Sequence, residues 1–220
     1  MINRKPYYDL FLTYCIQRQK IMSKARTRLS PEVRKKQLLS TAKGMIVNEG
    51  LQTFTMEALA RTAGVTSPLV YNYFSSRQIL LQDLLTQVYT EFTSQLTQEV
   101  SAAKSFEEIV TVFIASNFDH HSPGNILPIL LSQPDIASSI KKIQKEQSHQ
   151  MAGFLVRNTA DKYKLSKPQA ELLTSMSSGA SIAAAGYAAR GRVNRKKTIQ
   201  TALTYMLAGM EKVASQSQDQ

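Results

Sequence analysis

The side chains best suited to specific recognition stand close together, in residues 66–72. Hydroxyl and amide groups can exchange hydrogen bonds with base edges, whereas proline and leucine suit the methyl group of thymine. Hydroxyl and guanidinium groups just outside this stretch could hold phosphates, which fixes register without reading sequence. The residues placed to meet base edges are Thr66, Ser67, Pro68, Leu69 and Asn72, Tyr71 could contact a base or a phosphate, and the residues expected to hold phosphates are Thr55, Arg61, Tyr73 and Arg77.

Residues 55–74 read as two short helices joined by a tight turn, which would position these side chains. Thr55 can cap the first helix, and Gly64 can end it because glycine readily adopts positive φ. Pro68 is tolerated because it falls in the first turn of the second helix. Ala60, Gly64 and Val70 supply a small crossing residue, a turn glycine and a buried anchor. This spacing predicts a helix-turn-helix, whose second helix enters the DNA major groove.

The string GVTSPLVYNYF at residues 64–74, followed by Ser76-Arg77, resembles the signature of the TetR family of bacterial regulators. In that family a Gly-Val-Ser turn leads into a recognition helix ending Tyr-x-Tyr/His-Phe, with a lysine shortly after. The resemblance covers roughly residues 30–80. Arg77 stands where lysine is usual, which keeps the charge. Leu69 stands where a small or hydroxyl-bearing residue is common, so base contacts there would be apolar.

Positive charge gathers around the predicted helix-turn-helix. The formal net charge is +11, and residues 1–80 hold 13 Lys/Arg against 4 Asp/Glu, whereas residues 81–220 hold 14 against 12. This asymmetry favours phosphate binding over a generally basic surface kept for solubility. A second basic run at residues 190–197 is interpreted as a solvated loop between helices, with a second DNA or anionic-partner contact as the alternative.

Residues 1–29 are interpreted as an N-terminal extension and a basic arm. Arg4 and Lys5 precede an apolar stretch, but no small-x-small cleavage site follows, so a signal peptide is rejected. Residues 22–28 look like an ordinary protein start. We therefore suspect that residues 1–21 come from an upstream start-codon choice, the alternative being a genuine extra helix. No apolar run approaches the ~20 residues that span a bilayer, so we expect no membrane contact and a cytoplasmic protein.

The remaining pattern is helical throughout, without alternating strands, so we predict an all-α chain. A three-helix head at residues 30–75 forms the DNA-binding domain. A long helix from Ser75 or Ser76 to about Val100 joins it to an all-helical ligand-binding and dimerisation domain at residues 76–213. A single helix is expected from Ser132 to about Leu165, Asn194 is expected to cap the last helix, and residues 214–220 are predicted to be a disordered tail.

Small residues in the last two helices would let backbones approach closely, at a cost of about 0.5–1 kcal/mol for each helical glycine. The resemblance implies that these helices dimerise, the alternative being close packing within one subunit. The resemblance also implies a small-molecule pocket lined by an apolar set, although each member taken singly suits a plain core better. The predicted dimer residues are Gly179, Ala180, Ala183, Tyr187, Leu203, Met206 and Met210, and the predicted pocket residues are Val88, Phe92, Phe113, Phe118, Met151, Phe154 and Met176.

No pattern of residues indicates an enzyme, a cofactor or a metal. Cys15 is the only cysteine, and the neighbouring His120 and His121 would point about 100° apart on a helix, so they rarely share one ion. We therefore predict a homodimeric regulator that binds an inverted repeat in double-stranded DNA. It is expected to be a repressor released by a small apolar or amphipathic ligand. The alternative is a similar DNA binder gated by a protein partner, with no small-molecule ligand.

Overall fold

A computed structural model describes residues 29–122, 124–191 and 193–218. The predicted extension and most of the basic arm lie outside these ranges. The described residues divide into two compact units, with the boundary between Lys36 and Gln37, inside helix α2, Pro31–Glu49. In the first unit the Val33 N–H donates to Ser30 Oγ at 3.3 Å, so the serine before Pro31 caps the start of this helix.

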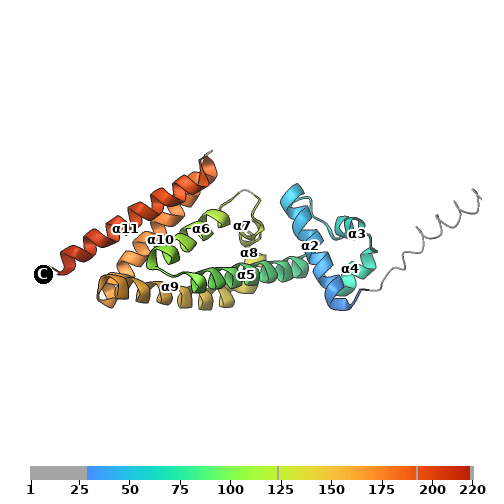
Figure 1. The fold of residues 1–220 in the computed structure, drawn as a ribbon. Coiled ribbons are helices and arrows are strands. Elements are labelled where there is room, and N and C mark those ends of the chain that lie inside the picture. The colour runs from blue at the N-terminus through green and yellow to red at the C-terminus, as the bar shows by residue number, and fades with distance from the viewer. Residues whose placement is uncertain (1–28, 123, 192, 219–220) are drawn as a thin grey trace, which may run out of the picture. The chain divides into compact units, whose positions relative to one another are not determined.

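The second unit is built from helices alone in the residues that the structure describes, which confirms the all-α prediction (Figure 1). Side-chain oxygens of Ser76, Ser105 and Asn194 accept hydrogen bonds from the backbone N–H groups three residues later, at 3.2, 3.1 and 3.0 Å. The starts at Ser76 and Asn194 are those that the sequence predicts. The helices that follow α2 are α3 (Met56–Ala63), α4 (Ser67–Tyr73), α5 (Arg77–Ala102), α6 (Phe106–His120), α7 (Ile126–Leu131), α8 (Pro134–Ala137), the 3-10 turn η1 (Ser138–Ile140), α9 (Lys141–Tyr163), α10 (Lys167–Arg190) and α11 (Arg195–Gln218).

Two helices differ from their predicted bounds. The single helix expected over residues 132–165 is divided into α8, η1 and α9. Within this stretch the hydroxyls of Ser138 and Ser139 donate to backbone carbonyls three residues earlier, which competes with regular helix geometry. Helix α11 continues five residues past Val213, and Ala214 is 4% exposed, so part of the tail predicted to be disordered is a packed helix.

A first hydrophobic core joins α2 from Leu38 onward to α3, α4, the first half of α5, α7 and α8. Leu59 of α3, Leu85 of α5 and Leu130 of α7 are all fully buried in it. The core therefore runs without a break across residue 76, where the sequence predicts a domain boundary. A shift in the position of α5 therefore displaces the packed side chains that support the helix-turn-helix.

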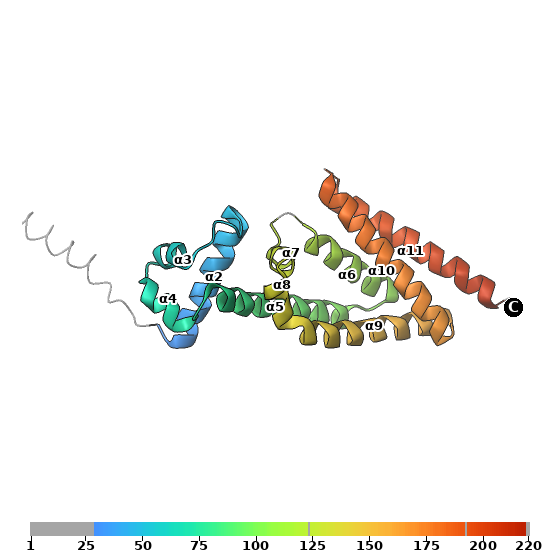
Figure 2. The same ribbon diagram turned by 180° about the vertical axis from the view of Figure 1, so that it is seen from behind.

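A second core packs α6 against α10 and α11, through residues such as Ile114, Ala185 and Met206. Helices α10 and α11 lie side by side in both views of the chain (Figures 1 and 2). Across the described ranges, no helix is long and apolar enough to cross a membrane.

Candidate nucleic-acid interface and cleft

Residues at its two ends, Thr55 and Gly64, determine where helix α3 begins and ends. The Ala58 N–H donates to Thr55 Oγ1 at 3.0 Å, so the threonine caps the helix. Gly64 ends it with φ +66°, and the N–H of Val65 returns to Ala60 O at 3.0 Å. A Cβ at Gly64 would meet nothing within 4 Å, so the positive φ rather than lack of space makes glycine the suitable residue.

Helix α4 presents one side to the core and another to solvent. Val70 and the following Phe74 are fully buried, which anchors the helix in the first core, where α4 packs on α3. Pro68 lies in the first turn, where its missing N–H costs no hydrogen bond. The predicted base-reading residues Thr66, Pro68, Tyr71 and Asn72 are exposed, and Ser67 and Leu69 are half-buried. The outward side of α4 therefore carries hydrogen-bonding and apolar groups at a surface that a groove could meet.

The four residues predicted to hold phosphates have different surroundings. Arg61 is exposed in the last turn of α3, whereas Tyr73 is half-buried against the first core. Thr55 is exposed and already accepts the capping hydrogen bond. Arg77 is engaged as well, since its Nε and Nη2 donate to Phe54 O and Leu51 O at 3.0 and 2.8 Å. Sequence reasoning missed this contact, because nothing in the local pattern pairs residues more than twenty positions apart.

Tyr71 links the two helices of the motif. Its hydroxyl donates to Glu57 Oε1 at 3.2 Å, joining α4 to the first turn of α3. Desolvation, followed by the negative charge and hydrogen bond of Glu57, raises the pKa of the Tyr71 phenol. The contact with Glu57 thus favours the protonated phenol, which is the donor of this hydrogen bond.

Replacing Asn72 with alanine is expected to relax base preference at one position of the bound site, at a cost of about 1–3 kcal/mol for the preferred base. The reason is that the exposed Asn72 amide can donate and accept at a base edge. Selection of bound sequences from a random DNA pool, with wild-type and variant protein in parallel, measures this. Arg61→Ala is the control, and it should weaken all sequences alike. An unchanged ranking for the Asn72 variant would remove this residue from base reading.

A cleft of about 480 Å³ opens beside α5 and α6. Its wall on α5 contains Val88, which is 8% exposed, and the half-buried Phe92. Apolar, charged and uncharged polar side chains all contribute to the lining, the uncharged polar ones being Gln95, Ser116, Ser122 and Asn125. The apolar residues are Val88, Phe92, Leu96, Ile126 and Leu127, and the charged residues are Lys43, Glu91, Glu99 and Asp119.

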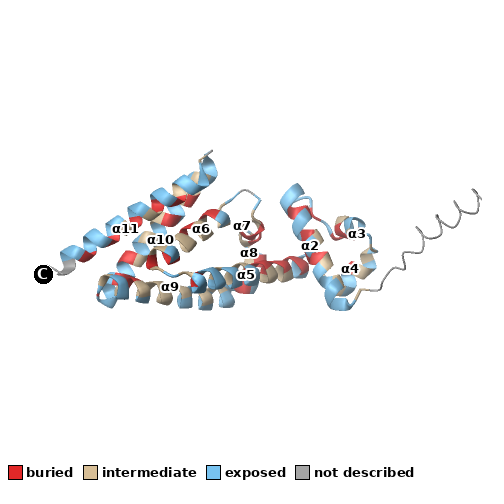
Figure 3. Cartoon of the chain, in the orientation of Figure 1, coloured by how far each residue is buried: buried red, intermediate tan, exposed pale blue. Residues whose placement is uncertain are grey.

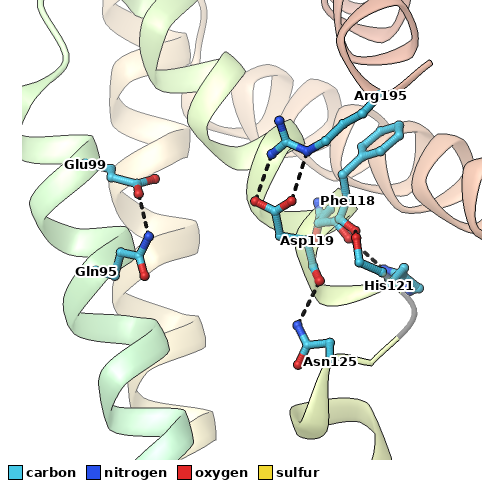
Figure 4. A network of polar contacts seen from close by, with 9 residues as sticks. Gln95, Glu99, Phe118, Asp119, His121, Asn125 and Arg195 are labelled. Carbon is cyan, nitrogen blue, oxygen red and sulfur yellow. Dashed lines mark hydrogen bonds and ion pairs between the residues drawn. The ribbon is translucent and has the colours of Figure 1, made fainter. Parts of the chain in front are cut away.

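Polar contacts tie Asp119 of this cleft to neighbouring elements, whereas Glu99 accepts from Gln95 of its own helix at 2.9 Å (Figure 4). Arg195, the first residue of α11, donates to both carboxylate oxygens of Asp119 at 3.0 and 2.8 Å. Asn125 Nδ2 donates to the backbone oxygen of Asp119 at 2.8 Å, and its Oδ1 accepts from Leu127 N at the start of α7. The end of α6 is thus bonded both to the start of α11 and to the start of α7.

The seven predicted pocket residues do not line one cavity. Val88 and Phe92 line the cleft, whereas Phe113 lines a separate space of about 60 Å³ among α6, α9, α10 and α11. Phe118 is buried in the second core, as an ordinary core residue. Met151 and Phe154 are half-buried on α9, and Met176 is 62% exposed on α10.

The predicted dimer residues also separate into two groups. Met206 and Met210 are buried against α6 within the subunit, and the half-buried Ala180 and Leu203 pack on the same core. Gly179, Ala183 and Tyr187 are exposed, and exposed stretches run along both helices (Figure 3). Large exposed apolar side chains that the prediction omitted lie on the same two helices: Leu172, Met176, Ile182, Tyr205 and Val213. Helical spacing in α10 could have identified Leu172 and Met176, which stand seven and three residues before Gly179.

The two neighbouring histidines end α6. His121 Nδ1 lies 2.8 Å from Asn117 O, and the two imidazole rings meet edge to face with centroids 5.3 Å apart. Burial and then the charge of His121 lower the pKa of His120. Among the described residues, no group of three or more His, Cys, Asp or Glu is arranged to hold a metal ion.

The fold and the outward side of α4 define a helix-turn-helix DNA-binding protein. The model of the bacterial regulatory proteins, tetR family, matches residues 38–84. The chain belongs to the TetR family, and it is a DNA-binding transcriptional regulator.

Two regulators are similar to this chain in sequence, and one solved structure is similar to it in fold. HTH-type transcriptional regulator BetI of Vibrio parahaemolyticus is 24% identical over 149 residues, which cover 65% of this chain and 74% of that protein. HTH-type transcriptional regulator LuxR of Vibrio harveyi is 32% identical over 80 residues, 36% of this chain and 39% of that protein. The solved fatty acid degradation regulator FadR from Bacillus halodurans superposes with a TM-score of 0.59 at 17% identity, covering 79% of this chain and 98% of that one. That structure supports the fold alone.

Proposed function

We propose that this chain is a dimeric repressor that leaves its operator when a small apolar or amphipathic ligand enters the cleft beside α5. The cleft itself carries the proposal, because about 480 Å³ lies within the range of small-molecule sites, about 300–1,000 Å³. Its mixed lining suits a ligand with an apolar body and a polar end. The space of about 60 Å³ among α6, α9, α10 and α11 is too small for such a ligand.

Helix α5 supports the connection between ligand and DNA. It starts at Arg77, four residues after the end of α4, and continues as one helix past Val88 and Phe92 in the cleft wall. In this proposal residues 30–75 act as the DNA-binding domain and residues 76–213 as the ligand-binding and dimerisation domain, in the cytoplasm. A ligand that binds one arrangement of α5 better than another would shift the protein toward that arrangement.

The exposed apolar residues of α10 and α11 support the dimer. Leu172, Met176, Gly179, Ala183 and Tyr187 are exposed at steps of four, three, four and four residues, so they share one side of α10. Apolar area of this kind in contiguous arrangement marks association surfaces in many proteins. The small Gly179 and Ala183 would allow a second copy to approach closely.

The protein is expected to select an inverted repeat from a random pool of double-stranded DNA. A two-fold dimer presents its two recognition helices with opposite polarity, so each reads one half-site. Sequencing of the selected fragments, with the mass of the protein–DNA complex measured in solution, tests both points together. Selection of a single asymmetric half-site by one subunit would contradict the dimer.

A further inference from the structure

Arg77 does more than add charge next to the recognition helix. We propose that Arg77 is a positioning residue, which clamps the loop between α2 and α3 onto the start of α5 and so sets the spacing of the two recognition helices. The clamp consists of the hydrogen bonds from Nε to Phe54 O at 3.0 Å and from Nη2 to Leu51 O at 2.8 Å. The step from clamp to helix spacing rests on the proposed dimeric function.

The two carbonyls belong to buried residues, and Leu51 O also accepts a longer hydrogen bond from Phe54 N, at 3.4 Å. Leu51 and Phe54 are 7% and 2% exposed, and they lie in the short connection that ends at the α3 cap, Thr55. A buried carbonyl without a hydrogen-bond partner is costly, so a charged donor aimed at both contributes stability there. The Arg77 guanidinium carbon also lies 5.8 Å from the centroid of the Phe54 ring, which adds a cation–π contact.

The clamp joins the beginning of the motif to the helix that follows it. Residues 54 and 77 bracket α3, the turn and α4, so the contact closes the helix-turn-helix into a ring fastened at the start of α5. Phe74 inside the ring is fully buried. A tilt of α5 would therefore carry α3 and α4 with it, whereas without the clamp the connection at residues 74–76 could absorb part of the tilt.

Lysine cannot replace arginine in this contact. The guanidinium is a planar fork whose separate nitrogens reach two acceptors, whereas the lysine ammonium is a single centre on a flexible chain. A residue that only attracts phosphate should accept lysine readily, because the charge is kept. Arg77→Lys therefore distinguishes the clamp from a simple phosphate contact.

The first test needs no DNA. Amide hydrogen exchange of the intact chain should become faster over residues 51–59 in Arg77→Lys than in wild type. The reason is that the lysine ammonium cannot keep both hydrogen bonds that the guanidinium makes to the loop. Arg61→Lys, on the exposed side of α3, is the matched control and should leave the exchange unchanged. Arg77→Gln is the second variant, and circular dichroism shows that each protein is folded. Unchanged exchange in both Arg77 variants would overturn the clamp, whether or not the proposed dimeric repressor is correct.

The second test uses the selected inverted repeat and two versions with one base pair added to or removed from the spacer. Arg77→Lys should lose roughly tenfold in affinity for the native spacing, the scale of one hydrogen bond from a charged donor. It should lose much less on the altered spacers, so that preference for spacing falls. An equal loss on all three DNAs would indicate only a less stable protein, and no loss on any would indicate a phosphate contact; either result overturns the positioning role. Failure of the wild-type protein to select an inverted repeat would count against the proposed function instead, and the exchange experiment would still decide the clamp.

Discussion

Raising the salt concentration from about 50 to about 200 mM is expected to weaken operator binding by roughly 10³–10⁵-fold, the loss for a protein that neutralises about 6–10 phosphates. The reason is that residues 1–80 hold 13 Lys/Arg against 4 Asp/Glu, so much of the affinity should come from released counterions. Fluorescence anisotropy of a labelled operator at a series of salt concentrations gives the slope of log affinity against log salt.

Single charge removals show where that slope arises. Arg61→Gln should reduce its magnitude by about 1.8, since the slope changes by about 0.9 for each phosphate contact and a dimer loses two. Lys196→Gln is the control, because Lys196 is exposed at the start of α11 in the second basic run. The sequence predicts a loop over residues 190–197, but Arg190 ends α10 and residues 195–197 begin α11. A slope that falls equally for Lys196→Gln would assign DNA contact to that run. Operator affinity that does not change with salt concentration would contradict phosphate binding altogether.

The helix-turn-helix was accessible to sequence reasoning because its determinants are local. The cap at Thr55, the positive φ of Gly64 and the buried Val70 all depend on residues within a few positions of each other. Each of these residues restricts the backbone conformations open to the segment that follows it. The pattern therefore predicts the motif without knowledge of the rest of the chain.

The cleft was not accessible in this way. Val88 and Asp119 face a common space only because α5 and α6 pack at a particular angle, and a helical repeat of apolar residues gives no information about that angle. For the same reason Met206 and Met210 were predicted to meet a second subunit, whereas their apolar side lies against α6. An apolar stripe indicates that a helix is covered, but it does not identify the covering element.

Replacing Val88 with tryptophan is expected to lower operator affinity by roughly 5–150-fold in the absence of ligand, the range of typical allosteric coupling. Val88 lines the cleft and is 8% exposed, so a larger ring there should occupy space that a ligand would fill. It lies eleven residues after Arg77 on one continuous helix, a distance of about 16 Å. The ring should therefore press α5 toward the arrangement that a ligand favours, and the recognition helices would leave their operator spacing.

Thr90→Trp is the matched control, because Thr90 is exposed on α5 about 200° around the helix from Val88 and does not line the cleft. Operator affinity is measured for both variants, together with circular dichroism, since overpacking at Val88 could cost about 1–3 kcal/mol of stability. Compounds that raise the melting temperature of the wild-type protein in a screen of small amphiphiles are then added. The wild type and Thr90→Trp should release DNA, whereas Val88→Trp should no longer respond because its cleft is occupied. Unchanged affinity together with an unchanged response in Val88→Trp would remove α5 from the switch, and gating by a protein partner would then be the better account.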